Sequence, residues 1–235
     1  ICVVSIFVNP TQFNNAEDLQ KYPRTLEKDT TLLESLGVHF VFAPTAEEMY
    51  SAEEMQARFS FDFNGLDEVM EGKMRPGHFN GVVQVVSRLF ELVRPTRAYF
   101  GEKDFQQLAI IRHMVEHSTL SSNFNNLKIV GCPIVREASG LALSSRNERL
   151  SDNEKQTAVA ISQTLIASLE WAKTDSLEEV QKRVIDTINA IDGLEVEYFE
   201  IVDKTTLQPT TTFDNAIGCV TVYCGPVRLI DNIQY

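Results

Sequence analysis

The sequence predicts an α/β protein in which a doubly wound parallel sheet is followed by a smaller, separate α+β domain. Strand-like and helix-like segments alternate over residues 1–115, which is the order of a parallel sheet covered by helices. The first run, 1–8, is continuously apolar and β-branched, as expected of a strand buried on both faces. Beyond residue 150, helical patterns give way to alternating segments rich in Val, Tyr and Ile, which favours antiparallel strands.

The elements of the first domain follow from apolar periodicity and from the residues that start and stop helices. Gly37 suits the left-handed position after a helix, and Thr45 with Glu48 forms a capping-box pattern. We expect strands over 1–8, 38–43, 98–100 and 127–130, helices over 26–36, from 45, over 82–93 and after 104, an irregular stretch over 51–70 with a strand piece near 58–63, and a mobile loop over 71–81.

The second domain also has clear helix-start signals. Ser151 and Ser176 are each followed three residues later by a glutamate, so each is expected to cap a helix. The expected helices run to about 172 and about 191, and three strands follow over 194–203, 216–224 and 227–234. A boundary near residue 134 divides the chain into domains 1–134 and 135–235.

Composition limits the possible functions. The 235 residues are 43% hydrophobic and 23% charged, which describes a globular protein with a substantial core. A net charge of −12 argues against nonspecific nucleic-acid binding, and no apolar run reaches membrane-spanning length. The four cysteines are scattered without metal-ligand spacing, so we expect reduced thiols in a cytoplasmic protein.

The charged turn after the third expected strand is the most informative stretch. Apolar residues lead into Gly101, and Glu102, Lys103 and Asp104 follow before an apolar rhythm of helical spacing. Glycine permits close backbone approach, and a helix start offers free N–H groups and a positive dipole end. With lysine as a compact cation, the turn suits an anion such as phosphate. The alternative is an ordinary charged turn of an α/β protein.

Two other places offer groups for a small acid. Asn9 and Gln12 follow the first expected strand, and ligands of α/β sheets bind outside the carboxyl ends of strands. The alternative is a turn in which Asn and Pro serve the backbone. Arg75 and His78 lie in the glycine-rich stretch before a buried helix, where they are candidates for phosphate or carboxylate contacts, or simply part of an exposed loop.

A hydroxyl-rich segment and an acidic helix start complete the candidates. Ser144, Ser145 and Arg146 combine two hydroxyls with a guanidinium, a combination that suits phosphate, although plain loop chemistry would look the same. Glu27 and Asp29 begin the helix over 26–36; they are candidates to support a metal ion or a solvated first turn.

Six collinear motifs resemble the pantothenate synthetase family, and together they cover the whole sequence. They are SIFVNPTQF at 5–13, YPRT at 22–25, RPGHFNGV at 75–82, FGEKDFQQL at 100–108, VREASGLALSSRN at 135–147 and RLIDNI at 228–233. The resemblance implies an ATP-dependent ligase of coenzyme A precursor synthesis. Such an enzyme joins (R)-pantoate to β-alanine through a pantoyl adenylate, with Mg²⁺, and releases AMP and pyrophosphate. It also implies a Rossmann-like nucleotidyltransferase domain, a smaller C-terminal lid domain and a homodimer.

The resemblance also assigns roles. Gln12 is similar to the family's glutamine that contacts pantoate and β-alanine, and Gln107 to its second pantoate-binding glutamine, with Asn9 and His78 as further substrate-binding candidates. Lys103 would meet phosphate oxygens, and Asp29 is a weaker candidate for supporting the metal. The implied ATP-binding residues are Gly101, Glu102, Lys103, Asp104, Val135, Leu143, Ser144, Ser145 and Arg146, of which Lys103, Ser144, Ser145 and Arg146 would act on the phosphates in catalysis.

One family feature has no counterpart here. The family's histidine pair follows its first strand and would lie before Ile1, so none of the histidines, His39, His78, His113 and His117, takes the role of its catalytic histidine. Ile1 opens directly into a strand-like run without an initiator Met or signal-peptide features. We therefore expect that the sequence begins inside a domain.

Two other functions remain open at this point. One is another adenylyl or cytidylyl transferase of the same superfamily, although Gln12 and Gln107 argue against a phosphorylated acceptor, which would require more cations. The other is a nucleotide-binding or oligomerisation module that lacks the catalytic segment.

Overall fold

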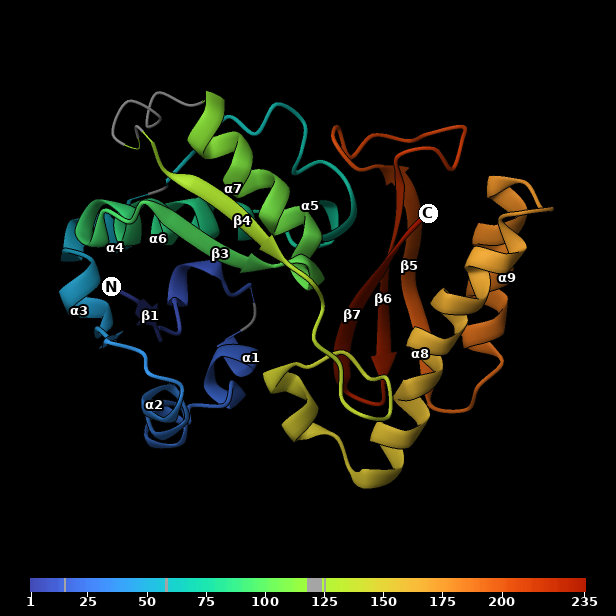
Figure 1. Ribbon diagram of the computed structural model, residues 1–235, viewed down its shortest axis with the longest axis horizontal. Coiled ribbons are helices and arrows are strands. Elements are labelled where there is room, and N and C mark those ends of the chain that lie inside the picture. The colour runs from blue at the N-terminus through green and yellow to red at the C-terminus, as the bar shows by residue number, and fades with distance from the viewer. Residues whose placement is uncertain (15, 58, 118–123, 125) are drawn as a thin grey trace. The chain divides into compact units, whose positions relative to one another are not determined.

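The computed structural model describes residues 1–14, 16–57, 59–117, 124 and 126–235 (Figure 1). The chain forms two compact units, each built from two stretches of sequence. The first unit consists of Ile1–Asp62 with Arg75–Arg94, and the second of Phe63–Met74 with Pro95–Tyr235. Each unit is described by itself below.

The first unit is built on a parallel strand pair and one long buried helix. Strand β1 (Val3–Ser5) pairs with β2 (Phe40–Phe42) in parallel. A short 3₁₀ helix, η1, follows β1 and packs against α6. The helices are η1 (Pro10–Gln12), α1 (Ala16–Lys21), α2 (Leu26–Ser35), α3 (Ala46–Met49), α4 (Ala52–Gln56) and α6 (His78–Val93).

Several expectations for this unit are confirmed. Helix α2 ends where predicted, and Gly37 takes a left-handed φ of 77°. At the start of α3, Thr45 Oγ1 accepts a hydrogen bond from Glu48 N at 3.3 Å, and Thr45 N donates to the Glu48 carboxylate at 2.7 Å. Both halves of the predicted capping box are therefore formed.

Three expectations for this part of the sequence are wrong. The strand expected over 1–8 is limited to Val3–Ser5, and it is not buried on both faces as expected, because Val3 is 36% exposed and Phe40 of its partner strand is 61% exposed. No strand forms over 59–63, and residue 58 lies outside the described residues; a second capping box at Ser51 starts α4 just before this stretch instead. The stretch 71–81 is mostly helical, because α5 ends at Met74 and α6 begins at His78, four residues earlier than expected.

The second unit contains a parallel strand pair and an antiparallel sheet. Strand β3 (Arg97–Gly101) pairs in parallel with β4 (Lys128–Cys132), and helix α7 lies between them in sequence. The other elements are α5 (Met70–Met74), η2 (Glu102–Asp104), α7 (Phe105–His117), η4 (Ser145–Arg149), α8 (Asp152–Trp171), α9 (Leu177–Asn189), β5 (Leu194–Asp203), β6 (Ala216–Cys224) and β7 (Val227–Gln234). The three expected antiparallel strands are confirmed, in the order β5-β6-β7.

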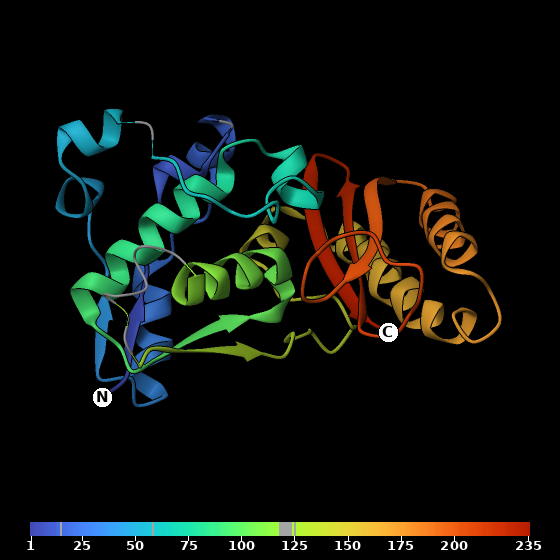
Figure 2. The same cartoon turned by 90° about the horizontal axis from the view of Figure 1, so that it is seen from above.

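Helices α8 and α9 build a hydrophobic core against the antiparallel sheet of this unit (Figures 1 and 2). Leu165 of α8 and Val184 of α9 are at most 1% exposed, and Phe199 of β5 packs in the same cluster. Both helices begin at the predicted capping boxes, where serine N–H groups hydrogen-bond to Glu154 and Glu179 and hold the pKa of each carboxyl below its ordinary value. The expected α+β architecture after residue 150 is therefore confirmed.

Two further properties bear on function. All four cysteines are free thiols, and burial raises the pKa of Cys219 above its ordinary value. Among the described residues, no helix combines the length and the hydropathy needed to cross a membrane.

Candidate active site

In the first unit, Asn9 is the centre of a buried hydrogen-bond cluster around Gln12. Asn9 is 1% exposed and caps η1. Its Oδ1 accepts bonds from Thr11 N at 3.4 Å, Thr11 Oγ1 at 3.1 Å and the Tyr50 hydroxyl at 3.0 Å. Its Nδ2 donates to Gln12 Oε1 at 3.3 Å and to Gly81 O at 3.0 Å. The Asn9 amide is thus fully used inside the protein, which favours a role in holding Gln12 over a direct contact of its own.

Tyr50 is a partner that sequence inspection did not identify. Burial is the main cause that raises its pKa to about 12, so the hydroxyl stays protonated and donates to Asn9. The two residues are separated by 41 positions, and no local pattern links them.

The glycine of the RPGHFNGV motif lets helix α6 approach η1 closely. A Cβ at Gly81 would lie 2.6 Å from Thr11 O and 2.7 Å from Gln12 Cα. These are backbone atoms, which cannot swing aside. Gly81 therefore fixes how near the Gln12 backbone lies to α6.

His78 supports Gln12 from the first turn of α6. Its Nδ1 lies 2.8 Å from Gln12 O, and its Nε2 lies 3.2 Å from Arg75 Nη1. A guanidinium can only donate, so Nε2 accepts from Arg75, and Nδ1 carries the proton that is donated to Gln12 O. The contacts thereby select one neutral tautomer of a buried histidine.

Asp29, the predicted metal-supporting residue, lies in the first turn of α2. Its Oδ2 accepts a hydrogen bond from Thr25 Oγ1 at 3.1 Å. Within the described ranges, no cluster of three or more His, Cys, Asp or Glu side chains is arranged to hold a metal ion.

In the second unit, the predicted phosphate turn has the expected backbone. Strand β3 ends at Gly101, η2 carries residues 102–104, and α7 begins at Phe105. Gly101 has an ordinary φ of −69°, and a Cβ there would meet nothing within 4 Å. Neither the fold nor its own neighbours require glycine at this point, so the space beside it is available to a ligand.

Lys103 is half-buried in this turn. Its ammonium has no hydrogen-bond or ion-pair partner among the residues that the structure describes. An unpaired, partly desolvated cation at the start of a helical run is suited to bind an anion.

The structure distinguishes the two adjacent glutamines, which the sequence alone could not. Gln106 is 4% exposed; its Nε2 donates to Leu66 O and Val69 O, and its Oε1 accepts from Glu71 N. Gln106 therefore holds the segment before α5 in place. Gln107 is half-buried, and among described residues its side chain has no hydrogen-bond partner, which leaves both ends of its amide available to a substrate.

The segment 135–147 forms a short hairpin that brings the predicted nucleotide contacts together. Leu143 N donates to Val135 O at 2.9 Å, and these two side chains are 49% and 65% exposed. Ser144 caps η4 by accepting from Arg146 N at 3.2 Å, and Arg146 Nη1 donates to Arg228 O at 3.5 Å. Exposed apolar side chains next to hydroxyls and a guanidinium suit a nucleotide base and its phosphates.

A largely buried ionic cluster in the second unit was also not predicted from the sequence. Arg228 of β7 donates to the Glu71 carboxylate at 2.7 and 2.8 Å and to Glu197 Oε2 at 2.5 and 2.9 Å. Burial opposes the charged form of Arg228, but its hydrogen bonds and the charges of both glutamates more than offset this, and its pKa is raised. Arg228 belongs to the RLIDNI motif, which was its only signal in the sequence.

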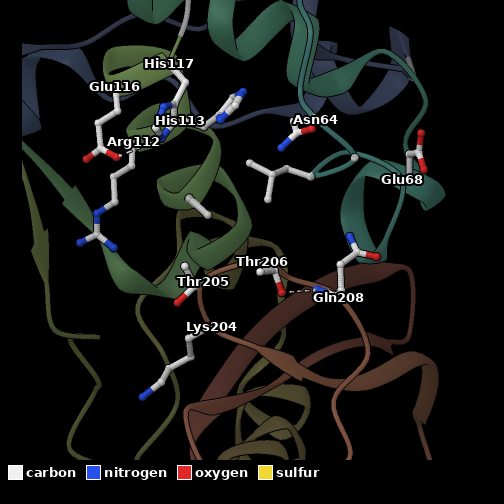
Figure 3. A pocket seen from close by; sticks show the side chains of 13 residues that line it. Asn64, Glu68, Arg112, His113, Glu116, His117, Lys204, Thr205, Thr206 and Gln208 are labelled. Atoms are coloured by element: carbon white, nitrogen blue, oxygen red, sulfur yellow. Dashed lines mark hydrogen bonds and ion pairs between the residues drawn. The ribbon is translucent and has the colours of Figure 1, made fainter.

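A pocket of about 940 Å³ lies in the second unit but contains none of the predicted site residues (Figure 3). The C-terminal half of α7 lines it, including His113 and His117, whose ring centroids are 5.3 Å apart. The stretches 64–68 and 204–208 supply the remaining wall. The predicted phosphate turn precedes the opposite end of α7, so this pocket is separate from the predicted chemistry.

Comparisons with known proteins identify the family. Residues 1–234 match the family described as pantoate-beta-alanine ligase. The chain is 60% identical to a pantothenate synthetase of Phocaeicola vulgatus and 52% identical to one of Porphyromonas gingivalis, in each case over 100% of this chain and 82% of the relative.

Solved structures agree with the sequence relatives. A pantothenate synthetase from Thermus thermophilus has a TM-score of 0.90 and 42% identity, over 99% of this chain and 82% of that one. A pantoate-beta-alanine ligase from Francisella tularensis, complexed with beta-gamma ATP and beta-alanine, has a TM-score of 0.76 and 35% identity, over 99% and 78%. This chain therefore belongs to the pantoate-beta-alanine ligase family.

Proposed function

We propose that the chain joins (R)-pantoate to β-alanine with ATP, through a pantoyl adenylate, and releases AMP and pyrophosphate. The family match over residues 1–234 carries this proposal. The related Francisella tularensis protein was solved with beta-gamma ATP and beta-alanine, which agrees with two of the three substrates. The Lys103 ammonium, which has no partner among the described residues, and the amide of Gln107 supply matching groups for phosphate and for a hydroxy acid.

In the first step, a pantoate carboxylate oxygen attacks the α-phosphorus of ATP, and the bond to pyrophosphate breaks. A carboxylate is already a nucleophile, so the enzyme needs no covalent catalyst. Its task is to align the reactants and to neutralise the charge that grows on the phosphates. We assign that neutralisation to Lys103, to the hydroxyls of Ser144 and Ser145, and to Arg146.

In the second step, the β-alanine amine attacks the acyl carbon, AMP departs with the bonding electrons, and the amine loses a proton. Gln12 contacts both acids in this assignment, and Gln107 holds pantoate. His78 and Asn9 keep Gln12 oriented through its carbonyl and its side chain. An amide both donates and accepts, which suits the hydroxyls and the carboxylate of pantoate.

The remaining assignments concern the nucleotide and the metal. In this assignment Gly101 and Asp104 face the ribose, and Val135 touches the adenine. Glu102 and Leu143 are further ATP-binding residues. Mg²⁺ would neutralise charge on the ATP phosphates. A Mg²⁺ ion that enters with a nucleotide needs only one or two protein carboxylates, and Asp29 is the candidate.

The broader organisation is also part of the proposal. We assign 1–134 to a Rossmann-like substrate domain and 135–235 to a lid that excludes water from the acyl adenylate. A homodimer and a cytoplasmic location are proposed from the family resemblance and from the cysteine usage.

Pantoate-dependent exchange of pyrophosphate into ATP tests the function directly. We expect exchange with the unaltered protein, and a loss of roughly two to three orders of magnitude for Lys103→Ala and for Arg146→Ala, because each removes a group that stabilises transition-state charge. Lys173→Ala is the matched control, since this exposed lysine forms an ion pair with the exposed Glu170. Exchange that requires another acid would refute the substrate assignment, and a change of less than a few-fold would remove the altered residue from the phosphate site.

A further inference from the structure

The strand β7 reaches the phosphate turn through one buried side chain, Asn232. Asn232 is 4% exposed. Its Nδ2 donates to Glu102 O at 2.8 Å and to Lys103 O at 3.0 Å. A side-chain amide nitrogen carries two hydrogens, and both are used on consecutive carbonyls of η2.

These two bonds determine how the turn is oriented. Because a peptide unit is planar, holding the carbonyls of residues 102 and 103 fixes the two peptide planes that follow them. The peptide plane that follows residue 102 ends at Lys103, and the plane that follows residue 103 begins at Lys103. The direction in which the Lys103 side chain leaves the backbone is therefore set by Asn232.

The preceding residue, Asp231, anchors the other nucleotide segment. Its carboxylate is 5% exposed and accepts two bonds from Arg136, at 2.6 and 2.9 Å. It also accepts from Asn232 N at 2.8 Å, and Arg136 donates further to Gly140 O at 3.2 Å. A paired guanidinium and carboxylate form a directional, two-point contact. Arg136 directly follows Val135, so this contact fixes the start of the hairpin 135–147.

We propose that Asn232 and Asp231 are positioning residues for ATP, which hold the Lys103 turn and the 135–147 hairpin in a fixed relation to each other. Neither side chain needs to touch the substrate. The proposal rests on the function proposed above, because it takes these two segments as the ATP-binding ones. A misplacement of about 1 Å can cost roughly a hundredfold in rate, so two residues remote from the chemistry can still control it.

The substitution Asn232→Asp distinguishes a positioning role for Asn232 from a purely structural role. A carboxylate cannot donate to the two carbonyls, whereas the protonated acid can donate to one. The carbonyl oxygens of Glu102 and Lys103 disfavour a nearby negative charge, so protonation restores part of the contact. The titratable groups that face this position are Glu102, Lys103 and Asp104 of the turn and Asp231, which is paired with Arg136. On the neighbouring strands, Cys219 lies opposite Asn232, and Glu200 lies opposite Cys219.

We expect kcat/KM for ATP in the exchange assay to fall about ten- to a hundredfold at pH 8 in Asn232→Asp. This decrease in kcat/KM for ATP should become smaller as the pH is lowered towards 6. KM for pantoate should change by about twofold or less, since uniform binding of that substrate is not altered. Asp231→Asn should raise KM for ATP without the same dependence on pH.

The control is Ser168→Ala, which removes a buried hydrogen bond to Tyr235 in the same unit. It should lower the thermal midpoint and leave KM for ATP unchanged at every pH. If Asn232→Asp does not fold, Asn232→Ser keeps a single donor and binding of a non-hydrolysable ATP analogue is measured by calorimetry instead. Affinity for the analogue should then fall by about tenfold or more.

Two results would overturn the proposal. One is equal loss for ATP and pantoate, which indicates general destabilisation. The other is a pH-independent profile, or unaltered analogue affinity, in a folded Asn232 variant. Absence of pantoate-dependent exchange in the unaltered protein would instead refute the proposed function, so the two failures are distinguishable.

Discussion

Gly81 and Gly101 both belong to the candidate site, but the structure gives opposite explanations for why each position has no side chain. At Gly81 an added Cβ would overlap backbone atoms of Thr11 and Gln12, whereas at Gly101 it would meet nothing within 4 Å. Neither has a left-handed φ. One glycine is thus required by packing within the protein, and the other leaves room for a ligand.

Alanine substitutions at Gly81 and Gly101 should therefore have different effects on stability and on substrate binding. Gly81→Ala is expected to cost about 1–3 kcal/mol of unfolding free energy, as overpacking does, and to raise KM for pantoate because Gln12 is displaced. Gly101→Ala should leave the unfolding free energy within about 0.5 kcal/mol of the unaltered protein and raise KM for ATP. Urea denaturation and the exchange assay measure both, and each variant serves as the control for the other. Equal stability of the two variants would contradict the packing argument for Gly81.

At this scale the sequence identified most candidate residues but not their partners. Gln12, His78 and Lys103 stood in recognisable motifs, whereas Tyr50 and Asn232 could not be linked to them. Their hydrogen bonds join residues that are 41 and 129 positions apart in sequence, so local periodicity does not indicate them. Adjacent Gln106 and Gln107 look alike in sequence, and only burial tells them apart.

Helix starts were the most predictable elements because their determinants lie within four residues. At α9, Ser176 Oγ accepts from Glu179 N at 3.4 Å, and Ser176 N donates to the Glu179 carboxylate at 2.8 Å. The loop expected over 71–81 failed for a different reason. His78 is held by Gln12 O and Arg75, tertiary contacts that let the helix begin within a glycine-rich stretch.

The capping box of α9 gives a prediction for this element alone. Ser176→Ala should lower the unfolding free energy by about 1 kcal/mol, as loss of an N-cap does, and should leave exchange activity unaltered. Thr174→Ala, at an exposed position before the cap, is the control. Unchanged stability in Ser176→Ala would mean that the cap contributes nothing in this context.

The same element has a pH dependence with a definite sign. The hydrogen bond from Ser176 N lowers the folded-state pKa of Glu179. Its stabilisation is therefore present above the ordinary carboxyl pKa and is lost as the pH falls through the lowered value. Glu179→Gln should be less stable than the unaltered protein at pH 7, and the difference should disappear in acid. A difference that does not depend on pH would contradict this assignment.

At the scale of the whole molecule, the Arg228 cluster joins segments that lie far apart in sequence. Arg228 and Glu71 are separated by 157 positions, and Tyr198 and Thr221 also donate to Glu71. The cluster attaches α5 to the antiparallel sheet within the second unit. The boundary proposed near residue 134 separates these partners in sequence, and composition gives no sign of their contact.

Arg228→Met should cost about 3–5 kcal/mol, because removing one partner leaves buried charges uncompensated. Urea denaturation at pH 8 measures this cost. Lys173→Met, which breaks an exposed pair with Glu170, should cost only about 0.2–1 kcal/mol. A similar cost for both variants would show that the buried cluster adds no more than a surface pair.

The architecture was predictable where it depends on local pattern, and less so where it depends on pairing. Strands β1 to β4 pair in parallel and β5, β6 and β7 pair antiparallel, as predicted, whereas the choice of partner for each strand was not predicted. The strand expected over 1–8 was too long, because an apolar run indicates burial and does not indicate how many residues pair with a neighbouring strand. Only three residues of β1 are paired, with Phe40–Phe42.

The bonds from Asn232 to the Lys103 turn span 130 and 129 positions, and this has a consequence for folding order. A ribosome makes the turn long before it makes β7, so a nascent chain carries Lys103, the lysine proposed to bind phosphate, on an unanchored backbone. Pairings between distant positions also form slowly, because the intervening loop must close first. The capacity to bind ATP should therefore arise late and in one step, when β7 adds to the sheet, which keeps unfinished chains from sequestering nucleotide.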